Sequence, residues 1–204
     1  MVLNNHLRGL RICMAVSGHN AADDRIFYKE SRSLAKAGAT VVLLCPQGKR
    51  LPKDPDGVQI VEYDRCPGWR GRALGMTTLA DAIAQSNCAV VHCHEPDSLL
   101  AALRVKREHG IKVIFDSHEL WAGAIAGRFP RPFWPGLSAA YRILERRWLA
   151  QCDAAIGASE AISDYLASVL GRDRVVTILN VPEASLFGEF ARPPAGEATV
   201  LCHE

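Results

Sequence analysis

Histidine and carboxylate side chains follow two apolar stretches in the middle of the chain. The first stretch reads V-V-H-C-H-E-P-D and the second reads V-I-F-D-S-H-E. Imidazole and carboxylate groups can transfer protons, bind sugar hydroxyl groups or ligate a metal ion. Because side chains alternate between the faces of a strand, residues two apart within each stretch share a face. The residues concerned are His92, His94, Glu95, Asp116, His118 and Glu119.

A metal centre is one chemistry that these residues allow. His92 and His94, with Asp116 and His118 from the second stretch, would supply imidazole and carboxylate ligands. However, His92 lies deeper in its stretch and is equally typical of a core histidine with satisfied hydrogen bonds. We therefore expect no metal ion in the site.

Proton transfer or hydrogen bonding to a sugar is the other chemistry. A neutral imidazole at the end of a strand can accept a hydroxyl proton, and Glu95 or Glu119 could orient it. The competing interpretation is that these side chains cap helices and bind loop amides. We favour a functional role for His118, whereas His94 fits both interpretations equally.

Strand-like and helical patterns alternate about seven times and position these residues. This alternation predicts an α/β fold, a Rossmann-like doubly wound parallel sheet of about seven strands. Ligands bind such sheets beyond the carboxyl ends of the strands, here at residues 17–20, 93–96 and 116–119. The expected strands are 11–17, 40–45, 58–63, 89–94, 112–116, 154–158 and 175–179. The expected helices are 24–36 (with Asp23 or Asp24 as cap), 73–85, 96–108, 137–151 and 159–170, with a basic turn over 65–72 and a long loop or broken helix over 120–135.

The loop after the first strand reads S-G-H-N-A-A-D-D and contains one glycine. It lacks the G-x-G-x-x-G pattern of dinucleotide sites, and the chain has no P-loop, so we expect no cofactor. Gly18 permits close approach of a ligand, and His19 follows it. Arg25 could pair with Asp24, with Glu95 or with an anionic acceptor.

Composition and charge restrict the partners. The 204 residues carry a net charge of +2, which does not require a nucleic acid, and we expect none. Seven cysteines without a C-x-x-C pattern indicate reduced thiols in a cytoplasmic protein. The aromatic and basic segment 128–135 fits either a rigid packed loop or a peripheral contact with the inner face of a membrane.

Three segments together resemble the bacterial family-four glycosyltransferases, which have the GT-B fold. They are D-D-R-I-F-Y-K-E-S-R-S-L-A-K-A-G-A-T-V-V-L-L, the two stretches V-V-H-C-H-E-P-D-S-L-L and V-I-F-D-S-H-E-L, and I-L-N-V-P-E. The resemblance implies two Rossmann-like domains facing each other across a cleft. The N-terminal domain mainly binds the acceptor, and the C-terminal domain binds the nucleotide-sugar donor.

The resemblance also implies roles for individual residues. Transfer retains the anomeric configuration, usually without a metal. His118 would contact the saccharide or lipid-linked acceptor or the transferred sugar, supported by Asp116 and Glu119. Gly18 and His19 would line the cleft, although the lone glycine weakens the case for a backbone contact with donor phosphate.

The end of the chain suggests a domain boundary. We expect the acceptor-binding domain over residues 1–181, a linker over 182–197, and the first strand of a truncated donor domain over 198–204. The fragment alone is then expected to be inactive. Two alternatives remain open: a nucleotide-sugar epimerase of the same fold, and a binding module that has lost the chemistry.

Overall fold

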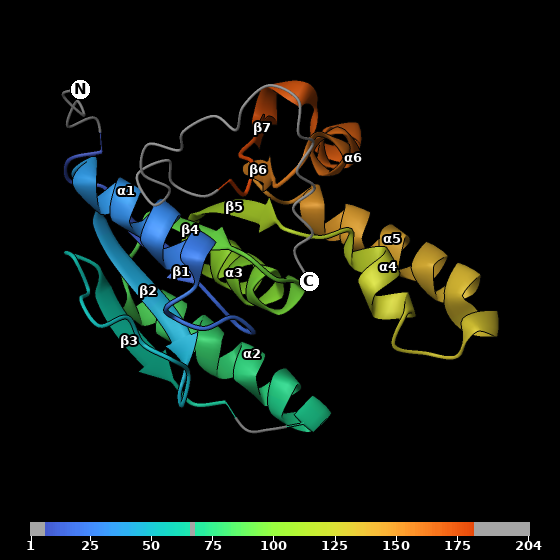
Figure 1. The fold of residues 1–204 in the computed structure, drawn as a ribbon, viewed down its shortest axis with the longest axis horizontal. Coiled ribbons are helices and arrows are strands. Elements are labelled where there is room, and N and C mark those ends of the chain that lie inside the picture. Colours follow the sequence, from blue (N-terminus) through green and yellow to red (C-terminus); the bar gives the residue numbers. More distant parts are fainter. Residues whose placement is uncertain (1–6, 66–67, 182–204) are drawn as a thin grey trace, which may run out of the picture.

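A seven-stranded parallel sheet organises the computed structural model, which describes residues 7–65 and 68–181 (Figure 1). The strand order is β3-β2-β1-β4-β5-β6-β7, so the order reverses between β1 and β4. This confirms the expected doubly wound, Rossmann-like fold. The linker over 182–197 and the strand over 198–204 lie outside the described residues. The strands are β1 (Arg11–Ala15), β2 (Thr40–Pro46), β3 (Gln59–Tyr63), β4 (Val90–Cys93), β5 (Lys112–Ser117), β6 (Ala154–Gly157) and β7 (Val175–Thr177).

Helices pack on both faces of the sheet and divide the core in two. On one face, Ile26 and Phe27 of a short helical segment pack with Met14. On the other face, four longer helices enclose a larger core that contains Cys13 and Val91. The segments on the first face are η1 (Asp24–Ser31) and α1 (Arg32–Lys36), and those on the second are α2 (Gly68–Gln85), α3 (Pro96–His109), α5 (Trp134–Leu149) and α6 (Glu160–Leu170).

The segment η1 is a π-helix, where the sequence predicted an ordinary α-helix. Its cap is Asp23, whose side chain accepts hydrogen bonds from the backbone amides of Arg25 and Ile26. Residues five apart lie about 140° apart around an α-helix, but they become neighbours in a π-helix, which forms i to i+5 hydrogen bonds. The π-helix therefore brings Arg25 and Glu30 together on the face that covers the sheet.

An arm of two antiparallel helices extends from the sheet after β5 (Figure 1). It consists of α4 (Trp121–Ala126), the 3-10 turn η2 (Arg131–Phe133) and α5. The broken-helix interpretation of 120–135 is thus confirmed, although α5 begins three residues earlier than expected. The basic turn predicted over 65–72 is wrong, since α2 already begins at Gly68. Of the two glycines in that segment, Gly71 lies inside the helix, where a glycine costs about 1 kcal/mol relative to alanine.

Two further features bear on the sequence predictions. Cys13, Cys45, Cys88, Cys93 and Cys152 are buried free thiols. Among the described helices, none combines the length and the apolar character that a membrane span requires.

Candidate active site

The carboxylate of Asp116 lies at the centre of the candidate site, at the carboxyl end of β5. Its side chain is fully buried, and Oδ2 lies 3.1 Å from Nε2 of His118. A carboxylate only accepts hydrogen bonds, so in the neutral imidazole Nε2 carries the proton and Nδ1 remains an acceptor. Asp116 therefore fixes both the orientation and the tautomer of His118, as expected for a supporting carboxylate.

Arg25 of η1 holds Asp116 from the opposite side. Its Nε donates to Oδ2 and its Nη2 donates to Oδ1, both over 3.0 Å. Its Nη1 donates to the carbonyl of Ile178 over 2.8 Å, which ties the segment after β7 to the site. The sequence suggested Asp24 or Glu95 as the partner of Arg25, and this is wrong because the guanidinium reaches Asp116 at the end of β5 instead.

Glu30, His92 and His94 complete a buried layer beneath His118. The two imidazole rings stack with their centroids 4.7 Å apart. Burial lowers the pKa of His92 to about 3 and also lowers the pKa of His94, so both rings are neutral. Burial and the nearby Asp116 carboxylate raise the pKa of Glu30 to about 9. For Asp116, interactions with His118 and His94 outweigh burial and hold the pKa below its usual range.

Glu95 anchors the loop that follows β1. Its Oε2 accepts from the amide of Ser17 over 3.0 Å, and its Oε1 accepts from the amides of Gly18 and His19 over 2.9 and 3.1 Å. A Cβ at Gly18 would lie 3.4 Å from the same Oε1, so the glycine allows this close packing. In this arrangement the loop amides are already occupied by Glu95, which argues against their binding a donor phosphate.

We predict that replacing Glu95 with alanine destabilises the chain by about 2 kcal/mol, because one buried and two partly buried amide donors lose a charged acceptor. Hydrogen exchange at Ser17, Gly18 and His19 should accelerate in parallel. Glu108→Ala is the matched control, since Glu108 lies in α3, the helix that Glu95 caps, and is exposed. Unfolding in urea would measure both variants, and equal stability of Glu95→Ala and Glu108→Ala would contradict the anchoring role.

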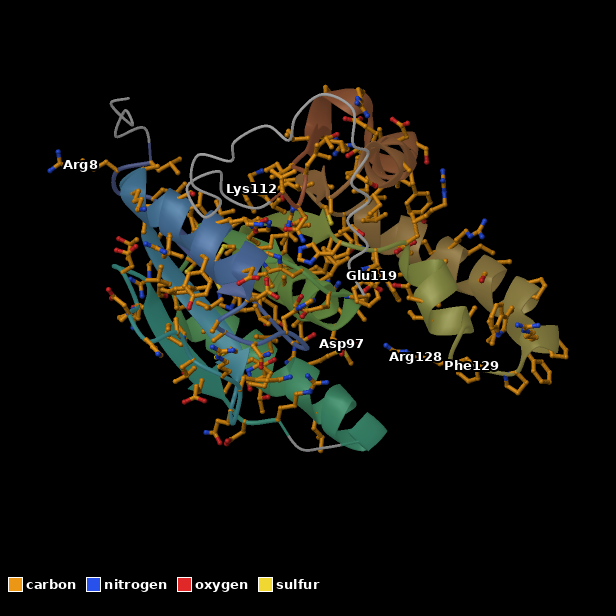
Figure 2. All side chains as sticks on the ribbon, viewed as in Figure 1. Arg8, Asp97, Lys112, Glu119, Arg128 and Phe129 are labelled. Atoms are coloured by element: carbon orange, nitrogen blue, oxygen red, sulfur yellow. The ribbon has the colours of Figure 1, made fainter. Side chains whose placement is uncertain are left out.

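Four of the residues selected from the sequence line the accessible edge of the site. They come from the loop after β1 and from the residues after β5. The ring centroids of His19 and His118 lie 5.6 Å apart, so the loop after β1 and the residues after β5 lie side by side. A hydrogen bond with Asp23 raises the pKa of His19. The four residues are Gly18, His19, His118 and Glu119, and Figure 2 labels Glu119 at this edge of the sheet.

The other four selected residues are buried beneath that edge. The side chains of Arg25, His94 and Asp116 are 4%, 0% and 0% exposed, and Glu95 is bound to loop amides. These positions fit residues that hold the cleft walls in place better than residues that touch a substrate.

The sequence analysis did not select Glu30 or Lys49. Glu30 reaches the site only because η1 is a π-helix, and no pattern in the sequence indicated that geometry. Lys49 follows β2, and its Nζ donates to the carbonyl of Gly18 over 2.6 Å. The sequence signal that could have identified Lys49 is its position shortly after β2, at the sheet edge where the carboxyl ends of the parallel strands lie and ligands bind.

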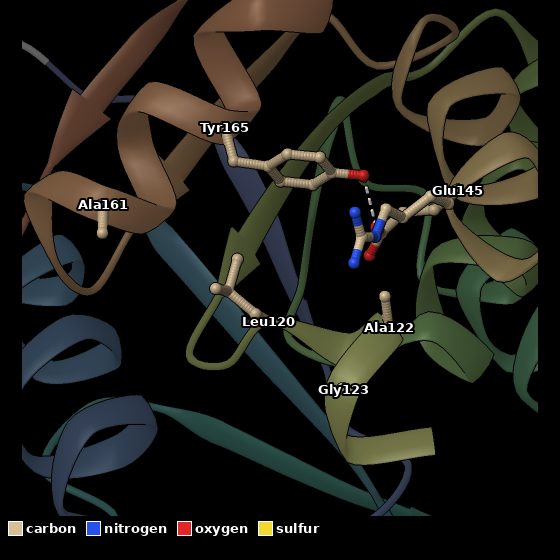
Figure 3. Close-up of a pocket in the computed structure, with 7 residues that line it drawn as sticks. Leu120, Ala122, Gly123, Glu145, Ala161 and Tyr165 are labelled. Atoms are coloured by element: carbon tan, nitrogen blue, oxygen red, sulfur yellow. Dashed lines mark hydrogen bonds between the residues drawn. The ribbon is translucent and has the colours of Figure 1, made fainter. Parts of the chain in front are cut away.

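A separate cavity of about 330 Å³ opens between the arm and α6 (Figure 3). Figure 3 shows Tyr165 of α6 reaching across to Glu145 of α5, and its hydroxyl donates to Glu145 Oε2 over 2.6 Å. Glu145 is buried, whereas its neighbours Arg146 and Arg147 are exposed. The cavity is lined by Leu120, Ala122, Gly123, Arg142, Glu145, Ala161 and Tyr165.

Glu145 gives the chain a predictable pH dependence. Burial raises its pKa above the ordinary value of 4.5, and the hydrogen bond from Tyr165 offsets this only in part. The unfolded chain thus loses this proton at lower pH than the folded chain. The stability that Glu145 contributes is fully present below pH 4.5 and declines as the pH rises toward the folded pKa.

Replacing Glu145 with glutamine should remove this decline, because glutamine keeps an acceptor for Tyr165 and cannot ionise. We expect wild type and Glu145→Gln to unfold alike at low pH and the variant to be the more stable at neutral pH. Unfolding in urea across this pH range provides the measurement, with exposed Glu108→Gln as control. If the stability of Glu145→Gln and that of the wild type change with pH in parallel, ionisation of Glu145 is not the cause of the decline.

A doubly wound sheet carries histidines and buried carboxylates together at the carboxyl ends of its strands, on both sides of the switch point between β1 and β4. The sequence profile of Glycosyltransferase Family 4 matches residues 25–181, which is more than half of the chain. The chain belongs to this family.

Solved structures share the fold at low sequence identity. Sucrose-phosphate synthase from Thermosynechococcus elongatus superposes with a TM-score of 0.58 at 14% identity, covering 83% of this chain and 48% of that one. HepE from Anabaena, solved in complex with UDP-glucose, gives 0.55 at 10%, covering 84% and 44%. UDP-N-acetylglucosamine 2-epimerase from Rickettsia bellii gives 0.53 at 14%, covering 82% and 44%. The chain thus spans about half the length of these proteins, and none of the curated protein sequences matches it.

Proposed function

We propose that this chain is the acceptor-binding half of a retaining glycosyltransferase. The enzyme would transfer a sugar from a nucleotide-sugar donor to a saccharide or lipid-linked acceptor. The observation that carries the proposal is the family match together with His118, which is fixed by Asp116 at the carboxyl edge of the sheet. In HepE, the same fold binds UDP-glucose.

In this proposal His118 is the catalytic residue, and its Nδ1 accepts a hydrogen bond from a hydroxyl group of the acceptor or the transferred sugar. Gly18, His19 and Glu119 bind substrate at the cleft edge. Arg25, His94, Glu95 and Asp116, which the sequence suggested as substrate-binding, act as positioning residues instead. The acceptor oxygen forms the new bond to the anomeric carbon, the bond to the nucleotide phosphate breaks, and the departing nucleotide takes the proton. No metal ion takes part in this step.

The donor would bind mainly to a second domain, so the 204 residues alone should not transfer sugar at a useful rate. The test compares this chain with a longer chain that adds a donor domain. Release of nucleoside diphosphate from UDP-, GDP- and ADP-sugars is measured with and without a lipid extract as acceptor. Acceptor-stimulated release by the longer chain alone supports the proposal, and robust transfer by the 204 residues would overturn it.

An epimerase is the second candidate, because one of the similar structures is a UDP-N-acetylglucosamine 2-epimerase. It would convert a nucleotide-sugar without any acceptor. Proton NMR of the nucleotide-sugar after incubation with the longer chain separates the two candidates: a new sugar configuration indicates an epimerase, and a new glycoside indicates a transferase. If the nucleotide-sugar remains unchanged under all conditions, the chain is a binding module.

The arm offers a surface for a peripheral membrane contact at the inner face of a membrane. Phe129, Phe133 and Trp134 are 49%, 62% and 39% exposed and lie among arginines, and no acidic residue occurs between Leu120 and Leu144. Figure 2 shows Phe129 on the turn that follows α4, away from the sheet. Aromatic side chains favour the membrane interface, and arginines attract anionic headgroups. The contact is supported if the chain sediments with anionic but not with neutral vesicles and if Phe133→Ser abolishes this sedimentation. It is contradicted if the wild-type chain does not sediment with either kind of vesicle.

A further inference from the structure

The buried layer beneath His118 contains five polar atoms without a hydrogen-bond partner in residues 7–65 and 68–181. They are both carboxylate oxygens of Glu30, Nε2 of His92, and both ring nitrogens of His94. Arg25 Nε lies 2.8 Å from Glu30 Oε1, but its hydrogen is directed to Asp116. Because nearly all buried polar atoms are satisfied in folded proteins, five such atoms in one place indicate a missing partner.

The atoms of this layer are arranged around a common point. His92 Nε2 lies 3.9 Å from Glu30 Oε2 and 3.8 Å from Asp116 Oδ2. His94 Nδ1 lies 4.0 and 3.6 Å from the same two oxygens. One ligand atom from each of the four residues falls within 4.8 Å of every other. Ligand atoms about 2.0 to 2.1 Å from a tetrahedral ion are separated by about 3.3 to 3.4 Å. The four distances above must therefore shorten by about 0.2 to 0.7 Å, and the other pairs of ligand atoms, which lie within 4.8 Å, by up to about 1.5 Å.

We propose that Glu30, His92, His94 and Asp116 bind a divalent transition-metal ion, with zinc as the ion that fits best. Two imidazoles and two carboxylates form a donor set typical of zinc, and four ligands complete its preferred tetrahedron. The proposed ligand atoms are Glu30 Oε2, His92 Nε2, His94 Nδ1 and Asp116 Oδ2. This set differs from the one weighed in the sequence, because Glu30 takes the place of His118.

The neighbouring arginine is compatible with the ion. Asp116 Oδ2 already accepts from Arg25 Nε and from His118 Nε2, so one donor must give way to a metal. Arg25 Nε has a second acceptor at hand in Glu30 Oε1, only 2.8 Å away. After this exchange, Nη2 still binds Asp116 Oδ1, and the arginine bridges the two carboxylates that hold the ion. Metal binding would displace the proton that Glu30 holds, and the two carboxylates and one guanidinium then leave one negative charge for the cation to balance.

The ion would connect η1, β4 and β5 directly beneath His118. Three of its ligands are buried and the side chain of Glu30 is 10% exposed. Four protein ligands leave no open coordination position for a substrate, so the site is a structural one. It would hold Asp116, and through it His118, at a fixed place in the cleft. This role does not depend on which reaction the cleft performs.

Zinc binding to the untagged chain, first stripped with a chelator, tests the site. Titration calorimetry with zinc sulfate should give a stoichiometry of one ion per chain. Thermal unfolding should show a higher midpoint with zinc than without it. His92→Gln and His94→Gln should each weaken binding at least about 100-fold, since even outer-sphere partners of a metal contribute 10- to 100-fold. His109→Gln, an exposed histidine at the end of α3, should bind as wild type does.

X-ray absorption at the zinc edge of the wild-type chain provides a second measurement that requires no variant to fold. Nitrogen and oxygen ligands with imidazole scattering at about 2.0 to 2.1 Å support the site. Sulfur ligands at about 2.3 Å would place the zinc on cysteines and overturn the proposal. Absence of binding, or equal binding by folded His92→Gln and wild type, would overturn it as well.

Discussion

Replacing His118 with alanine in a chain that includes the donor domain is expected to lower kcat/KM at least about 100-fold. His118 is the one side chain of the buried cluster that reaches the accessible edge, at 15% exposure, and Asp116 fixes its tautomer. The alanine variant loses the acceptor nitrogen that Asp116 directs toward the substrate. Steady-state release of nucleoside diphosphate at varied acceptor concentration measures the effect.

Two variants separate this role from a general loss of structure. His109→Ala removes an exposed histidine at the end of α3 and should leave turnover unchanged. His118→Gln keeps a polar side chain that can bind Asp116, so its fold should be intact while its kcat remains low. Turnover of His118→Ala within a few-fold of wild type would remove His118 from the mechanism.

The parts of the site that lie on strand ends could be predicted from the sequence. An apolar stretch that ends in histidine and carboxylate residues indicates both a buried parallel strand and the edge where ligands bind. The register of β4 with β5 pairs Cys93 with Phe115, which brings His94 beside Asp116. With this register, which the structure supplies, alternation along the strands places His92, Asp116 and His118 on one face.

The partners that come from η1 could not be predicted in the same way. Helical periodicity of 3.6 residues separates Arg25 from Glu30, whereas the π-helix makes them neighbours. The choice of Asp116 as partner of Arg25 depends on how η1 crosses the sheet, which is a tertiary property. Similarly, Glu95 follows a strand and precedes a proline, and this pattern does not distinguish a substrate ligand from an anchor of loop amides.

Arg25→Met is expected to lower the free energy of unfolding by about 3 to 5 kcal/mol, the cost of leaving a buried ion pair without one partner. Methionine retains much of the arginine volume but leaves the fully buried carboxylate of Asp116 without its bidentate donor. It also removes the link to the carbonyl of Ile178. Urea unfolding at neutral pH with a chelator present provides the measurement, since a bound cation could replace the missing charge.

The control lies at the start of the next helix. Arg32 pairs with Asp56 through side chains that are 32% and 37% exposed, and Arg32→Met should cost only about 0 to 1 kcal/mol. Replacing Asp116 with leucine in the Arg25→Met background should recover part of the loss, because an apolar pair no longer buries an unpaired charge. If Arg25→Met proves no more destabilising than Arg32→Met, the pair with Asp116 is not what holds η1 on the sheet, and the cleft wall beneath His118 must be fixed by other contacts.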